Sequence, residues 1–217
     1  TQHTYLDNYL GNTNKRYAID VPTLRSLAKE WMRNHAHLAV PELERFLTSL
    51  VKGESSTEKC MVGILLDYAT MEQWELEPLV FGTWLDHLQG WAEIDSLCSG
   101  KFVAYSMHRR RNEWKKLIKQ LSKSSNINRR RASLVLFVPP VRAVKHEQMC
   151  TEALATIDQL KEEREILITK AISWLLRSLL KHHRQEVKEY LRRNKPTLPA
   201  IAVRETEKKL LFGRKNP

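Results

Sequence analysis

The sequence of 217 residues predicts an all-α protein built from stacked helix pairs. Apolar residues recur at helical spacing in one run after another, and no stretch alternates convincingly as a strand would. Glycine is scarce, with 7 residues, which suits helices joined by short turns. A unit of 34–39 residues also recurs along the chain, and a helical repeat of this size is typical of stacked pairs that share one core.

The repeat is marked by one charged residue near the start of successive apolar runs. The six positions are Arg25, Lys59, Asp95, Arg131, Lys170 and Arg204. Stacked repeats place equivalent positions on one face, so these side chains are expected to form a row there. Five of the six are cations and Asp95 is the single anion.

The individual helices follow from their start and stop residues. Asp20 precedes Val21-Pro22 as an N-cap, Ser55 or Ser56 caps another helix, and Asn126 or Asn128 caps a third. Gly11 and Gly90 are predicted to end the helices that precede them, and the prolines at positions 139 and 140 to end the helix before them. The expected helices cover residues 5–10, 21–34, 41–53, 56–70, 75–88, 91–108, 112–122, 129–137, 146–160, 163–181, 185–194 and 199–212.

The bulk composition favours one soluble globular domain over residues 1–217 with an acidic partner. Lys and Arg number 36 against 25 for Asp and Glu, which gives a net charge of +11. Such an excess indicates nucleic acid or another acidic surface, and says nothing about fold. No apolar run approaches the roughly 18 residues that cross a bilayer, so no membrane partner is expected. The first residues show no signal-peptide pattern. Because the sequence starts at Thr1 and not at methionine, it allows for a further segment before this residue.

The chain shows no sign of a metal or disulfide framework. The three cysteines are an odd number, far apart and within apolar runs, so they are predicted to be reduced, buried thiols of a cytoplasmic protein. The eight histidines are scattered, and no CxxC or HExxH spacing occurs, so no metal site is expected.

Asp95 is the residue that the row of cations makes unusual. Cations along one face suit the phosphates of nucleic acid, and a carboxylate among them weakens such binding. The Asp95 carboxylate becomes useful if the protein must bind a positively charged group there, such as a cationic base. Trp91, one helical turn away, could add a cation–π contact to that group. The alternative is that Asp95 pairs with Arg131 of the next repeat and Trp91 is a core residue. The charge pattern leaves both open.

Further candidates lie on two later helices. The clusters 108–111 and 128–131 are basic, and such runs are usually solvated; Arg131 is in register with the row and is the predicted phosphate contact. Lys170, Trp174 and Arg177 share one helical stripe, which suits the wall of a groove better than a core position.

At these positions the sequence resembles the DNA alkylation repair enzymes of the AlkD type. The stretches 91–96, 130–136, 170–177 and 203–205 match the motifs of that family in order, and Tyr9 and the stretch 22–25 extend the match towards the start. Residue 90 is a departure, because Gly90 stands where a relative has an aromatic residue.

The resemblance implies a right-handed α-α superhelix, an α-solenoid of about six HEAT-like helix pairs with a concave basic groove. It also implies a monofunctional DNA glycosylase of base excision repair. Such enzymes hydrolyse the N-glycosidic bond of cationic N3- or N7-alkylated purines, such as 3-methyladenine and 7-methylguanine, in double-stranded DNA. They need no cofactor or metal, and we expect a monomer associated with the nucleoid.

Two sets of site residues are predicted. The resemblance, matched motif to motif, assigns the catalytic set and adds Tyr9, and the cations of the DNA-binding set come from the row, the basic cluster and the helical stripe described above. The catalytic set is Asp95, Trp91, Arg131 and Trp174. The DNA-binding set is Tyr9, Arg25, Lys59, Arg130, Lys170, Arg177 and Arg204.

Two other classes of function compete with the glycosylase. One is a non-catalytic solenoid that binds unusual DNA structures, and the other is a scaffold for protein partners. If five cations contact phosphates, the logarithm of the DNA affinity should fall against the logarithm of salt with a slope of about −4 to −5, and a shallow slope would favour the scaffold.

Overall fold

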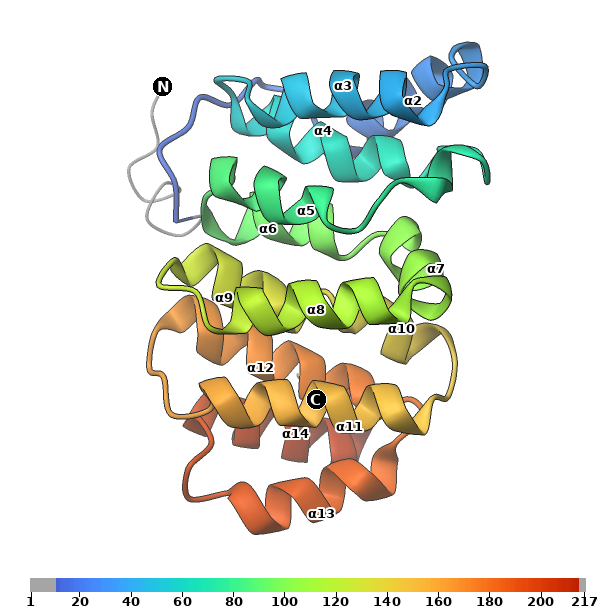
Figure 1. The fold of residues 1–217 in the computed structure, drawn as a ribbon. Coiled ribbons are helices and arrows are strands. Elements are labelled where there is room, and N and C mark those ends of the chain that lie inside the picture. Colours follow the sequence, from blue (N-terminus) through green and yellow to red (C-terminus); the bar gives the residue numbers. More distant parts are fainter. Residues whose placement is uncertain (1–10, 215–217) are drawn as a thin grey trace. The chain divides into compact units, whose positions relative to one another are not determined.

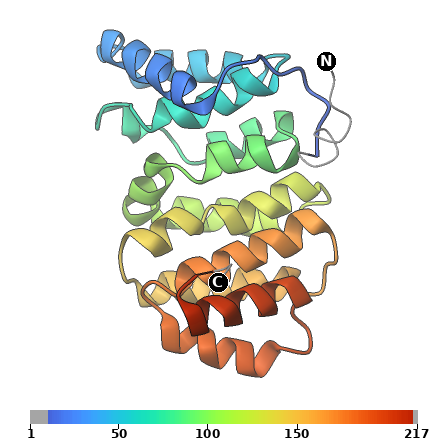
Figure 2. The same cartoon turned by 180° about the vertical axis from the view of Figure 1, so that it is seen from behind.

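The structure is a computed structural model, and it describes residues 11–214. The chain forms two compact units, residues 1–117 and 118–217, and the boundary between them falls within helix α8. Figures 1 and 2 show the chain from opposite sides. All regular elements of the described residues are helices, apart from one isolated bridge between Lys15 and Ser55. The predicted all-α class is confirmed.

The first unit is built around α4. Its elements are α2 (Val21–Asn34), α3 (Val40–Val51), α4 (Ser56–Leu66), η1 (Gln73–Glu75), α5 (Val80–Trp84), η2 (Leu85–His87), α6 (Gly90–Cys98), α7 (Lys101–Arg109) and the first part of α8 (Arg111–Ser122). Helix α4 packs against α2, α3 and α6. A cluster of aromatic side chains that includes Phe81, Phe102 and Trp114 fills part of the core, with the rings of Phe81 and Trp114 edge to face at 5.0 Å.

The second unit is built around α12. After α8 it contains α9 (Ile127–Val135), α10 (Val138–Ala143), α11 (Glu147–Leu160), α12 (Ile166–Leu179), α13 (Arg184–Asn194) and α14 (Ala200–Phe212). Helix α12 packs against α9 to α11, α13 and α14. Figure 2 shows α12 and α14, in orange and red, side by side.

Two expected helices are interrupted, and a third is followed by a helix that the sequence did not predict. The helix predicted over residues 75–88 is only the short α5 and η2, since Pro78 cannot donate within a helix. The helix over 91–108 divides into α6 and α7 at Gly100, where the Asp67 carboxylate accepts from the Lys101 amide at 2.6 Å. The prolines 139–140 do more than end α9, because they open the new helix α10. The expected helix over residues 5–10 lies outside the described residues.

Candidate functional site

Helix α6 carries Trp91 and Asp95, which are both half-buried. The helix begins at Gly90, whose φ of 71° lies in the left-handed region that favours glycine. An aromatic residue at position 90 would be strained in this backbone. The glycine that departs from the family pattern is therefore required by the way the chain enters α6.

A buried carboxylate and two asparagines fix the start of α6. Glu93 is 0% exposed, and it accepts from the Gln89 amide at 2.8 Å and from Asn14 Nδ2 at 2.9 Å. Asn12 Nδ2 donates to the Gln89 carbonyl at 3.1 Å. Residues 12–14 thus hold the first turn of the helix that carries the candidate carboxylate.

Helix α6 also crosses α4 at very short range. A Cβ atom on Gly63 of α4 would lie 1.9 Å from the backbone oxygen of Ser96. Ser96 Oγ donates to the Cys60 carbonyl at 2.7 Å across the same contact. Only glycine permits this approach, and the one sequence signal for it was a glycine within the apolar run of α4.

The negative charge of Asp95 acts on its surroundings in this unit. The pKa of the Cys60 thiol is raised to about 11, chiefly by burial, then by the Glu93 and Asp95 carboxylates. The thiol therefore stays protonated, and its Sγ donates to the Ala92 carbonyl of α6. Asp95 is the only carboxylate on α6 besides the fully buried Glu93.

The structure contradicts the predicted DNA-binding role of Lys59. The residue is only 7% exposed, and its Nζ donates to the carbonyls of Val51 at 3.0 Å and His87 at 2.7 Å. Through these two hydrogen bonds, the buried ammonium group links the end of α3 to η2. Lys59 is therefore a structural cation, and the row of phosphate contacts does not include it.

We expect Lys59→Met to lower the free energy of unfolding by about 2–4 kcal/mol, because it leaves two buried carbonyls without a donor. DNA affinity should change no more than in the control Lys52→Met, which removes an exposed cation from the end of α3. Urea unfolding and DNA titration of both variants test this. A Lys59 variant of unchanged stability with a specific loss of DNA affinity would contradict the structural role.

Two neighbouring arginines of α9 are engaged within the second unit. Arg130 pairs with Glu163 through two contacts, Nε–Oε1 at 2.8 Å and Nη2–Oε2 at 3.0 Å, and it also donates to two carbonyls of the preceding turn. This bidentate ion pair fixes the loop before α12, and the predicted DNA contact of Arg130 stays a prediction. Arg131 is 4% exposed and donates to the Leu167 carbonyl. This bond ties α9 to α12, and the predicted phosphate contact of Arg131 stays a prediction.

Helix α12 presents Lys170, Trp174 and Arg177 as the predicted stripe. Lys170 is exposed and Trp174 is half-buried. Arg177 Nε lies 3.5 Å from the Glu205 carboxylate, which also accepts from Ser173 Oγ at 2.6 Å. Burial lowers the pKa of Arg177 and the Glu205 charge acts against that shift. Arg177 is thus a partly buried member of an ion pair as well as a candidate for DNA.

Three cations of the row remain on the surface: Arg25, Lys170 and Arg204. Arg25 lies 3.6 Å from the Asp67 carboxylate. Tyr9 lies outside the described residues. The structure thus keeps exposed cations in both units, but fewer than the sequence predicts.

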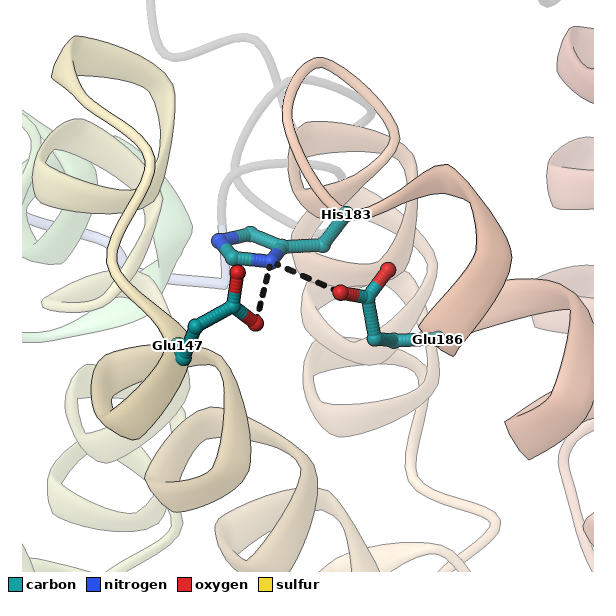
Figure 3. A group of neighbouring side chains, drawn as sticks. All are labelled: Glu147, His183 and Glu186. Carbon is teal, nitrogen blue, oxygen red and sulfur yellow. Dashed lines mark hydrogen bonds and ion pairs between the residues drawn. The ribbon is translucent and has the colours of Figure 1, made fainter.

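One group of side chains in the second unit has the composition of a metal site. Figure 3 shows Glu147 and Glu186 directed at Nδ1 of His183, at 3.7 Å and 3.5 Å. Nε2 of this buried ring accepts from the backbone amide of His146 at 3.3 Å. The neutral ring therefore carries its proton on Nδ1, facing the carboxylates. Coordination through Nδ1 would need that proton on Nε2, against the amide, so the hydrogen bonds favour a structural histidine that joins the starts of α11 and α13 over a metal ligand.

The described residues form an all-helical fold, the chain has a net charge of +11, and α6 carries a half-buried carboxylate. A family model described as DNA alkylation repair enzyme matches residues 2–210, and the chain belongs to this family. It is therefore a protein of DNA repair.

A solved structure, described as a predicted DNA alkylation repair enzyme from Enterococcus faecalis, is similar in fold. Its TM-score is 0.75 at 18% identity, and the match covers 96% of this chain and 94% of that one. The comparison with curated proteins gives no match. Within residues 11–214, no helix combines the length and the apolar character that crossing a bilayer requires.

Proposed function

We propose that this protein is a DNA glycosylase that hydrolyses the N-glycosidic bond of cationic N3- or N7-alkylated purines in duplex DNA. The observation that carries the proposal is Asp95, a half-buried carboxylate on a helix that Gly63, Glu93 and Asn14 hold in place, in a chain of net charge +11. An anion on a rigid helix of a cationic DNA repair protein is suited to a cationic target.

The proposed chemistry needs little besides this carboxylate. Alkylation at N3 or N7 makes the purine cationic, so it departs with the electron pair of the C1′–N bond as a neutral base. The sugar then develops positive charge, and two unit charges about 4 Å apart attract by roughly 4 kcal/mol at an effective dielectric constant near 20. Asp95 stabilises that charge and accepts a proton from the water that attacks C1′.

The other catalytic residues follow from the resemblance to the family. Trp91 and Trp174 would contact the deoxyribose with their rings, and Arg131 would lie near a phosphate. Trp91 and Trp174 are half-buried, so each side chain can contact a ligand on one side and the core on the other.

The direct test is release of free base from a duplex that contains one 7-methylguanine or 3-methyladenine. Chromatography of the products should show the free purine and an abasic site. Tight DNA binding without any released base would instead identify a non-catalytic member of the family.

The salt dependence of DNA binding separates both DNA-binding functions from a protein scaffold. With Lys59 and Arg131 buried inside the protein, three exposed cations of the row remain. We therefore expect a slope of about −3 for the logarithm of affinity against the logarithm of salt, shallower than five contacts would give. A slope near zero would favour the scaffold.

A further inference from the structure

The second unit contains a hollow where the ends of three helices meet. It measures about 230 Å³ and is lined by Arg142 at the end of α10, Ser178 and Leu180 at the end of α12, Lys181, Arg184, and Lys209 and Gly213 at the end of α14. One water requires only roughly 10–15 Å³ on this measure, so the hollow has room for a larger, solvated group.

Four cations surround the hollow, and none pairs with a carboxylate among the described residues. Three of them donate instead to backbone carbonyls of the converging helix ends. Lys181 donates to the Arg142 carbonyl at 2.7 Å, Lys209 to the Arg177 carbonyl at 2.9 Å, and Arg184 to the Leu210 carbonyl.

The helix ends explain only part of this accumulation of charge. Each C-terminus is equivalent to about −0.5 of an elementary charge, so three of them offset about 1.5 of the four positive charges. More than two positive charges remain around one hollow. Elsewhere in the same unit cations lie beside carboxylates, as Arg130 does with Glu163 and Lys195 with Glu207.

The titration of Lys209 agrees with this excess. Its pKa is lowered, first by burial and then by the charges of Arg177 and Arg142. The lysine therefore gives up its proton more readily than a solvated one, and a bound anion would reverse that effect.

We propose that this hollow binds a phosphate group through Arg142, Lys181, Arg184 and Lys209. Guanidinium and ammonium groups together provide the donors and the charge that a phosphate oxygen accepts. The phosphate can belong to the backbone of DNA or to a free phosphate ion, and both present the same chemistry. None of these four residues belongs to the set proposed for catalysis, and the site does not depend on the glycosylase function.

Arg142→Gln is the most informative variant, because the described structure shows no hydrogen bond or ion pair of the Arg142 side chain that the change would break. Arg142→Gln/Lys209→Gln removes two of the four charges. The matched controls are Arg45→Gln, and Arg45→Gln/Lys188→Gln, which remove exposed cations of α3 and α13. The unfolding midpoint of each variant in chloride alone shows whether the fold is retained.

The first arm measures thermal unfolding in sodium phosphate against sodium chloride at equal ionic strength. The second arm measures the affinity for an undamaged 12-base-pair duplex over a range of chloride concentrations. If the site binds free phosphate, the wild type and the controls are stabilised by phosphate and the double variant loses that gain. If it binds DNA, the double variant binds the duplex at least about tenfold more weakly than its control, and the salt slope falls by about 0.9 for each lost contact.

Either result supports the phosphate site and tells which source occupies it. Equal behaviour of the variants and their controls in both arms would overturn it. A protein that shows this binding and yet releases no alkylated purine would contradict the glycosylase proposal alone.

Discussion

Replacing Asp95 with asparagine should lower the rate of 7-methylguanine release by about 100-fold or more while duplex binding is kept or strengthened. The loss follows because a preorganised charge at a developing cation contributes about 3–4 kcal/mol to the barrier. Binding improves because removing a carboxylate from a cationic surface lowers its repulsion of phosphates.

Single-turnover release and equilibrium binding should be measured on the same methylated duplex for the wild type and Asp95→Asn. Glu54→Gln, which removes an exposed carboxylate from the turn before α4, controls for the change in net charge. Equal rates for the wild type and the Asp95 variant would remove this carboxylate from the mechanism.

Replacing Gly63 with alanine should destabilise the first unit by about 3 kcal/mol or more. The added Cβ would meet the Ser96 backbone at 1.9 Å, and a backbone oxygen cannot turn aside as a side chain can. Either α6 moves away from α4 or the unit fails to fold, and in both cases Asp95 is displaced.

Gly82→Ala is the matched control, since its Cβ would meet only the end of the Leu117 side chain, at 3.1 Å. A side-chain end needs to move by only a few tenths of an ångström here, and alanine favours a helix by about 0.5–1 kcal/mol over glycine, so the control should lose much less stability. Urea unfolding of both variants distinguishes them. Similar stability of the two would show that the crossing of α4 and α6 is looser than the structure indicates.

Local features of the fold could be predicted because the residues that determine them are close in sequence. Asp20 accepts from the Thr23 amide at 2.8 Å as the predicted N-cap of α2, and Ser55 and Glu58 bond reciprocally at the start of α4. Interruptions were harder to predict, because the break at Gly100 depends on Asp67, which lies a full repeat away.

The repeat pattern located the charged positions but not their surroundings. Lys59 lies at the position that the repeat predicts. The carbonyls of Val51 and His87 that accept its hydrogen bonds belong to other elements, α3 and η2. Asp95 could be singled out because its charge contrasts with the other five positions. The cluster of four cations around the hollow could not be predicted from the sequence. Arg142 and Lys209 are far apart in the chain, and only the folded helix ends bring them together.

The central claim is that Asp95 acts because the group it faces is positively charged. The most direct measurement compares the affinity of the protein for duplexes that contain a cationic pyrrolidine abasic analogue or its neutral tetrahydrofuran counterpart. The wild type should prefer the cationic duplex by about 100-fold or more, as expected for a mimic of the transition state, and Asp95→Asn should lose most of this preference. The same preference in both proteins, or none in the wild type, would contradict the account.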